Sequence, residues 1–167
     1  MSPRSPTLHA EISRLEAQIA SLERAGVLVD APLPAHSRHV LEDGTERFQV
    51  DGAAAMRNGI VLLYLRDFGI TRPAKGPVVV EDEYRSFSAA LQGADVIMRY
   101  DSGHISHSQR PHVHADWPKR LGLAFPELRI EQPVDLSDFV ISIERWREEH
   151  RHILPSDPPE LGRVRRR

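Results

Sequence analysis

The stretch YRSFSAALQGADVIMRYD, residues 84–101, decides how we interpret the fold. Two runs of strand-forming residues, 84–91 and 96–100, flank residues 92–95, whose glycine and aspartate are typical of a turn. The pattern predicts an antiparallel hairpin, and the alanines and leucine near its middle leave a helix over 83–91 as the alternative. The hairpin would end in Arg99-Tyr100-Asp101, directly before a histidine-rich segment.

Other segments also predict strands. Asp43-Gly44, between 38–41 and 45–50, is a strong signal for a second hairpin. Residues 60–68 are rich in strand formers, whereas the alanines just before them favour a short helix over 53–56. Shorter strands are expected at 78–80 and 127–131.

The first segment of the chain predicts a helix of about 18 residues. Its start is marked by Ser5 and Pro6 and its end by Gly26. Apolar residues recur in a heptad seam at Leu8, Ile12, Leu15, Ile19 and Leu22. Two interpretations carry equal weight: the seam packs on its own domain, or residues 8–22 form a homodimer seam or fill a groove of a partner protein.

The sequence as a whole predicts an α+β fold. It would combine an antiparallel β-sheet of hairpins with the heptad-patterned N-terminal helix and a C-terminal packing helix, capped by Asp135. The apolar face of that second helix comprises Leu136, Phe139, Val140, Ile143 and Trp146. The expected organisation is an N-terminal helix over 1–26, a proline-containing linker over 27–37, an α+β domain with the histidine-rich site over 38–153, and a disordered basic tail over 154–167.

Composition limits the function. A chain of 167 residues with net charge −2 fits one domain without a general basic surface for nucleic acid. Cysteine is absent, which leaves histidine, aspartate and glutamate as metal ligands. No apolar run is long enough to span a membrane and the first residues lack a signal-peptide core, so we expect a cytoplasmic protein with no membrane partner.

Four of the nine histidines fall within eleven residues, in the segment RYDSGHISHSQRPHVHADW, residues 99–117. His112 and His114 are two positions apart, so on an extended strand their side chains share one face. Histidine is the commonest metal ligand and titrates near neutral pH. The sequence therefore places the function in this segment.

Three functions fit these residues. His112 and His114, with a third ligand from His104, His107 or Asp116, would bind zinc or another transition metal and make a metal-dependent hydrolase. Without a metal, His112 and His114 would be the acid and base of RNA cleavage, with Arg99 or Arg110 facing the phosphate and Asp101 orienting an imidazole. The third function is a non-catalytic interaction module that assembles through the N-terminal helix.

Residues 84–146 resemble the TumE-type toxins of toxin-antitoxin modules. The resemblance is carried by Val96–Asp101, Gly103 and His112-Val113-His114. It implies a growth-inhibiting protein that acts on RNA and is neutralised by an antitoxin protein, with Tyr100, Asp101, His112 and His114 as site residues. Our leading hypothesis from the sequence is a toxin-like nuclease that uses His112, His114 and Arg99.

Overall fold

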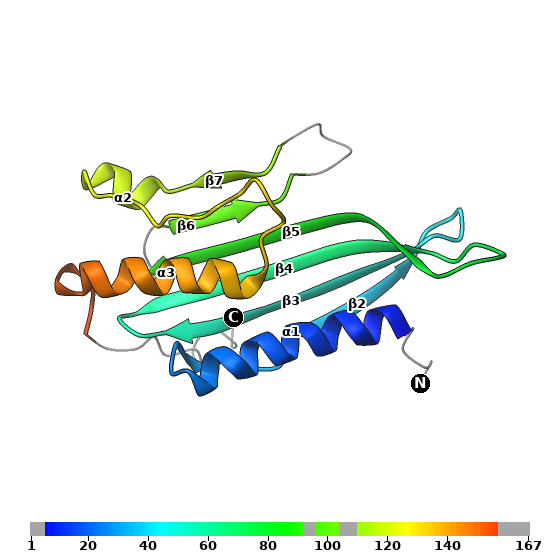
Figure 1. Cartoon of the computed structure of the whole chain (residues 1–167), viewed down its shortest axis with the longest axis horizontal. Helices are drawn as coiled ribbons and strands as arrows, with labels where there is room; N and C mark the ends of the chain where they lie inside the picture. Colours follow the sequence, from blue (N-terminus) through cyan, green and yellow to red (C-terminus); the bar gives the residue numbers. More distant parts are fainter. Residues whose placement is uncertain (1–5, 92–95, 104–109, 157–167) are drawn as a thin grey trace.

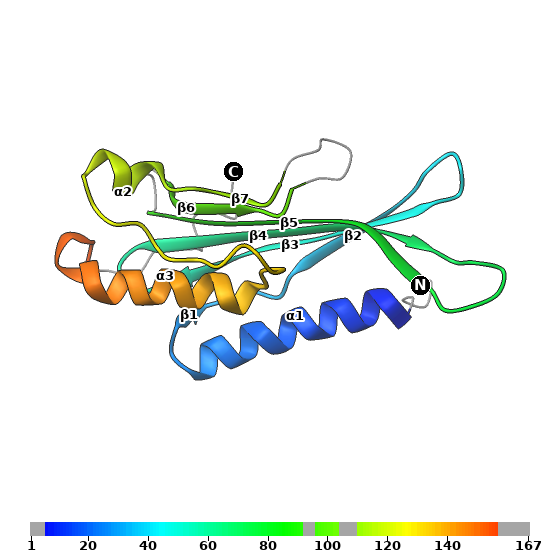
Figure 2. The same ribbon diagram turned by 45° about the horizontal axis from the view of Figure 1, so that its top comes forward.

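The computed structural model describes residues 6–91, 96–103 and 110–156, and all structural statements below concern these ranges. The described chain forms an antiparallel sheet with two long helices on one face (Figures 1 and 2). This is the α+β arrangement that the sequence predicts. In order, the elements are α1 (Pro6–Arg24), β1 (Leu28–Asp30), β2 (Ala35–Val40), β3 (Glu46–Met56), β4 (Ile60–Thr71), β5 (Val79–Leu91), β6 (Val96–Asp101), β7 (His112–His114), α2 (Asp116–Arg120), α3 (Leu136–His150) and a 3₁₀ turn (Arg151–Ile153).

The sheet follows the order β1-β3-β4-β5-β6-β7, and β2 also pairs with β3. The β5–β6 hairpin is confirmed, with Ser86 opposite Asp101 and Ser88 opposite Arg99, and no helix forms over 83–91. Its turn, 92–95, lies outside the described residues. The β2–β3 hairpin is confirmed as well, and Gly44 supplies the positive φ of its turn, +82°.

The core lies between the sheet and the two helices. Every second residue of β4 from Ile60 to Tyr64 is buried on this face, as the two-residue period of a strand requires. α3 covers the β5–β6 half, and its start is capped by Asp135, whose side chain accepts a hydrogen bond from the Asp138 amide at 2.9 Å. The expected C-terminal packing helix is therefore present.

The apolar side of α1 packs on its own sheet. Leu8 and Ile12 contact Phe48 and Phe68, while Ile19 and Leu22 join the main core. The helix ends where Gly26, at φ +73°, lets the Val27 amide donate to the Leu22 carbonyl at 3.0 Å. Four of the five side chains that the sequence offered to a dimer seam are thus buried within the chain itself, and Leu15 is partly buried against the same core.

Two expectations about local structure are wrong, and a third, the strand at 78–80, needs new bounds. Residues 53–56 are not a helix but the end of β3, because Ala54 and Ala55 are fully buried between neighbouring strands where small side chains fit. Val79 and Val80 begin β5 rather than forming a separate strand. Residues 127–131 form no strand: Leu128 and Ile130 pack against the core, but their backbone joins no ladder.

The expected linker over 27–37 also differs from the structure. Leu28–Asp30 is β1, and the last residues of the segment begin β2. All six residues of β2 are exposed, so this strand leaves no apolar pattern in the sequence and forms through its backbone pairing with β3. Of the expected tail, 157–167 lie outside the described residues, and Leu154 is buried against the core.

Candidate metal centre

Strand β6 separates the sequence-predicted site residues between the two faces of the sheet. Tyr100 turns toward the helices, is buried, and stacks on Phe87 with ring centroids 5.9 Å apart. Arg99 and Asp101 turn toward the opposite face, which we call the outer face. Tyr100 is therefore not brought together with the other predicted residues.

Strand β7 brings both histidines to the outer face. His112 lies opposite Asp101 and His114 opposite Arg99 in the antiparallel register, while Val113 between them packs against the core. The imidazole rings of His112 and His114 meet edge to face, with centroids 4.9 Å apart. The same-face pair expected from the spacing is confirmed, at the edge of the sheet.

His112 is oriented by the backbone of its own strand. Its Nδ1 lies 2.9 Å from the Arg110 carbonyl oxygen. A carbonyl oxygen only accepts hydrogen bonds, so Nδ1 carries the hydrogen and the neutral ring keeps its lone pair on Nε2. Nε2 faces Asp101, 3.8 Å from Oδ2. Metal-binding histidines commonly have this arrangement, in which one ring nitrogen donates to a carbonyl and the other faces the metal.

Asp101 is the buried member of the group, with 4% of its side chain exposed. The Tyr84 hydroxyl donates to Oδ1 at 2.7 Å. Oδ2 lies 2.8 Å from Nε of Arg99, but it has no aligned hydrogen-bond donor among the described residues. Burial by itself raises the pKa of Asp101, yet hydrogen bonds from Tyr84 and Ser86 and the charge of Arg99 outweigh it and hold the pKa below its usual value.

Asp101, His112 and His114 can serve one metal ion. Each offers one ligand atom, and these atoms lie within 4.8 Å of one another. Around tetrahedral zinc, with bonds of about 2.0–2.2 Å, ligand atoms lie about 3.3 Å apart. To hold such an ion the group would converge by about 1.5 Å or less, through rotation of the half-buried His112 ring and the exposed His114 ring.

The other sequence-predicted ligands do not join this group. Asp116 is exposed in the first turn of α2 and is not part of the cluster. His104 and His107 lie outside the described residues. Arg110 is exposed and contributes its backbone carbonyl, rather than its side chain, to the orientation of His112.

Sequence reasoning treated Tyr84 as a sheet residue and missed its contact with Asp101. The signal was the alternation in YRSFS, residues 84–88, which places Tyr84, Ser86 and Ser88 on one face of β5. The sequence does not show that this face lies beside Asp101, because that depends on the register of the β5–β6 hairpin.

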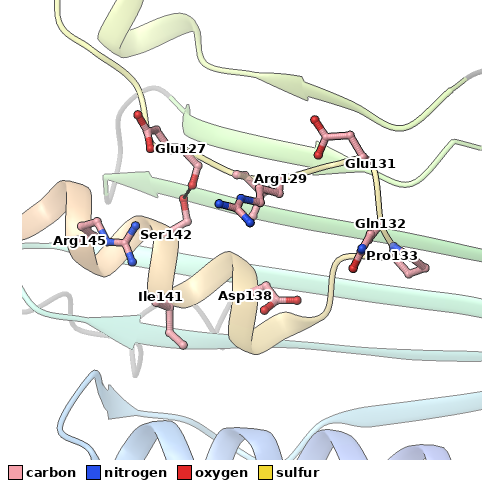
Figure 3. A pocket seen from close by; sticks show the side chains of 10 residues that line it. Glu127, Arg129, Glu131, Gln132, Pro133, Asp138, Ile141, Ser142 and Arg145 are labelled. Carbon is pink, nitrogen blue, oxygen red and sulfur yellow. Dashed lines mark hydrogen bonds between the residues drawn. The ribbon is translucent and has the colours of Figure 1, made fainter.

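A separate cleft of about 710 Å³ lies between residues 127–133 and α3 (Figure 3). Arg129 on the segment and Arg145 on the helix flank it, and Glu127, Glu131 and Asp138 also line it. These exposed side chains carry both signs of charge and converge on no common point. The cleft is on the helix side, so the sheet separates it from the histidines.

No family model matches the chain, and no match was found among curated proteins or solved structures. The resemblance to TumE-type toxins accordingly stays a prediction. Within the described residues, no helix is both long and apolar enough to cross a membrane.

Proposed function

We propose that the protein is a metal-dependent hydrolase whose centre is a transition-metal ion held by Asp101, His112 and His114. The observation that supports this most strongly is that Asp101, His112 and His114 each offer a ligand atom within 4.8 Å of the others, with Oδ2 of Asp101 buried and 3.8 Å from Nε2 of His112. A buried charged oxygen is costly unless a cation or donors satisfy it. Arg99 supplies a cation at 2.8 Å from Oδ2 in this structure, and a metal ion between the three ligand atoms would take its place.

The donor set favours particular metals. Two imidazoles and one carboxylate suit zinc, iron(II), cobalt or nickel, whereas magnesium and calcium prefer oxygen ligands alone. Three protein ligands leave a coordination position for water, which is typical of catalytic rather than structural sites. When bound, such an ion lowers the pKa of water to about 7 and polarises a substrate oxygen.

The protein's own residues would prepare this chemistry. The carbonyl of Arg110 keeps the lone pair of His112 on Nε2, and Tyr84 fixes the carboxylate of Asp101 through Oδ1. His114 is exposed at the sheet edge, so a substrate can reach the ion from the outer face.

Metal analysis of the untagged protein tests the proposal. We expect about one zinc-class ion per chain in the parent and a loss of at least about tenfold in affinity in His112→Ala, His114→Ala and Asp101→Asn. His39→Ala is the matched control, because His39 is an exposed histidine on β2, across the sheet from β7. Failure of the parent to bind any transition metal in calorimetric titration would overturn the proposal.

A second candidate is metal-free cleavage of RNA by His112 and His114, as in the toxin-like nuclease expected from the sequence. What favours it is the Asp101 carboxylate beside His112, with Arg99 on the same face. The two rings are 4.9 Å apart and in edge contact, so an acid and a base that flank a phosphodiester would first have to separate. For this reason we place this candidate second.

Chelation separates the two candidates. RNA cleavage that persists in EDTA and disappears in His112→Ala would favour the metal-free nuclease, and an antitoxin partner and a cytoplasmic location would then be the accompanying expectations. Hydrolysis that stops in EDTA and returns with added zinc would favour the metal centre. His39→Ala is the control for both assays.

A further inference from the structure

We propose that Arg99 is a displaceable cation that selects a phosphate ester as the substrate. It would neutralise Asp101 before the metal binds and, once displaced, would bind the phosphate group beside the ion. This inference rests on the proposed metal centre and deepens it. It has three supports: competition for one oxygen atom, the charge of the loaded site, and the position of Arg99 next to His114.

The first support is that Arg99 and the metal need the same atom. Nε of Arg99 lies 2.8 Å from Oδ2 of Asp101, and Oδ2 is the carboxylate oxygen whose distance to Nε2 of His112 is 3.8 Å. Oδ1 is engaged by the Tyr84 hydroxyl. A metal ion that also binds His112 must therefore displace Arg99 from Oδ2.

Arg99 is able to leave. Half of its side chain is exposed, compared with 4% for Asp101. Its guanidinium can regain water when it moves, whereas the buried Asp101 carboxylate is shielded from water and is stabilised by a cation at Oδ2. The ion pair thus satisfies the carboxylate in the metal-free protein without filling the site permanently.

The second support is electrostatic. The Arg99–Asp101 pair is neutral, and a divalent ion bound in the same place gives the group a net charge of +2. Asp101 is the only carboxylate in the cluster of described residues. An excess of positive charge at a partly desolvated surface attracts anions, so the loaded site favours an anionic substrate over a neutral one.

The third support identifies the anion. Arg99 lies opposite His114 in the β6–β7 register, so its side chain stays beside the ion after leaving Oδ2. The planar guanidinium of arginine matches two oxygens of a phosphate group, and a metal can hold a third. A phosphate ester presents the necessary oxygens, whereas a carboxylate has only two.

Calorimetric titration with zinc alone tests the competition. Arg99→Gln is expected to bind zinc about tenfold more tightly than the parent, because its Asp101 has lost the competing cation. Arg38→Gln is the control: Arg38 pairs with Glu46 at 3.0 Å and has a 46% exposed side chain, but it lies on β2. If Arg99→Gln bound zinc as tightly as the parent or more weakly, Arg99 would not compete with the metal for Asp101, and the proposal would be wrong.

Titration of the zinc-loaded proteins with inorganic phosphate tests substrate class. Phosphate is expected to bind Arg99→Gln about tenfold more weakly than the parent and Arg38→Gln equally well. Acetate should bind the loaded parent more weakly than phosphate does. Unchanged phosphate affinity in Arg99→Gln, or acetate binding as tight as phosphate, would overturn the assignment of a phosphate ester.

The results also separate this inference from the proposed function. If the parent binds no zinc, the metal centre itself is wrong. If the parent binds zinc and loses it in His112→Ala, but Arg99→Gln matches the parent in both titrations, the metal centre stands and the role of Arg99 is wrong. Circular dichroism of each variant confirms that the comparison is between folded proteins.

Discussion

At the scale of single residues, the candidate site depends on the hydrogen bond from Tyr84 to Asp101. The Tyr84 hydroxyl lies 2.7 Å from Oδ1 and fixes the direction of the carboxylate. Partners of this kind around metal ligands typically contribute about 10- to 100-fold in metal affinity. Tyr84 therefore belongs to the site although it contacts no ion itself.

Tyr84→Phe is expected to weaken zinc binding by about tenfold, because Asp101 loses its fixed orientation. Calorimetric titration measures the change. Tyr64→Phe provides a control on β4, since the Tyr64 hydroxyl is buried without a hydrogen-bond partner among the described residues. Its zinc affinity should equal that of the parent, and a similar loss in both variants would argue against a specific role for Tyr84.

The same Tyr64→Phe variant makes a prediction about stability. Burial raises the pKa of Tyr64 to about 12, which reflects an environment that disfavours charge. Removing a buried hydroxyl that lacks a partner is expected to stabilise the fold by about 1 kcal/mol. Urea unfolding measures this, and a destabilised variant would show that the hydroxyl is satisfied in solution.

At the scale of elements, strands β3 and β4 approach closely at Gly52. Gly52 lies opposite Tyr64 in the register, and a Cβ at position 52 would collide with the Tyr64 hydroxyl and ring. Tyr64 is buried in the core that the sheet forms with α1 and α3, so a shift of its ring would disturb this packing. The absence of a side chain at position 52 thus allows this aromatic residue to enter the core.

Gly52→Ala is expected to lower the free energy of unfolding by about 1–3 kcal/mol, the usual cost of overpacking. Gly69→Ala on β4 is the matched control, because the Cβ added there meets its nearest neighbour at 3.5 Å, an ordinary contact. Chemical denaturation of both variants gives the comparison. Equal stability of the two would contradict the packing argument.

Helix α1 is attached to the sheet by charged side chains as well as by its apolar face. Glu11 on α1 pairs with Arg66 on β4, which in turn pairs with Glu83 on β5 at 2.7 Å. Burial raises the pKa of Glu83, but Arg85 and Arg66 outweigh this and hold the pKa below its ordinary value of 4.5. The chain of ion pairs therefore makes stability depend on pH.

Glu83→Gln is expected to destabilise the protein by about 1 kcal/mol at pH 7. A carboxyl group with a lowered folded-state pKa contributes stability above pH 4.5 and loses it as the pH falls through its folded-state value. The difference in stability between Glu83→Gln and the parent should therefore become smaller below pH 4.5. Thermal unfolding of both proteins between pH 3 and 7 measures this difference. A difference that does not change with pH would show that the charge of Glu83 does not contribute to stability.

At the scale of the whole molecule, α1 is part of the core. Leu8 and Ile12 cover one end of the sheet, and Ile19 and Leu22 complete the cluster that also contains α3. An interaction module would present this helix to a partner, whereas here its apolar side is covered by the protein's own sheet. An interaction module that uses this helix would have to bind its exposed face or displace it from the sheet.

Removing residues 1–26 is consequently expected to abolish cooperative folding, because it exposes buried side chains such as Phe48 and Phe68 to water. Circular dichroism with thermal melting checks the truncated chain against the parent. A truncated protein that retains the parent's melting transition would show that α1 is dispensable for the fold and available to a partner.

The sequence by itself determined the features that local patterns encode. Asp135 and Gly26 marked helix ends, Asp43-Gly44 marked a turn, and the spacing of His112 and His114 placed both rings on one face. Strand alternation alone also requires Tyr100 and Asp101 to face opposite ways. Each of these results depends only on residues a few positions apart.

Only the tertiary structure decided which distant residues meet. Asp101 and His112 are joined by a connection whose sequence does not set the register, and Tyr84 reaches Asp101 from another strand. Ala54 lies in a strand although alanine favours a helix, because it is buried between neighbouring strands. The apolar seam of α1 is part of the core because it packs on the sheet of the same chain. The physical reason is that propensity acts over a few residues, whereas strand register and burial are set by the packing of the whole chain.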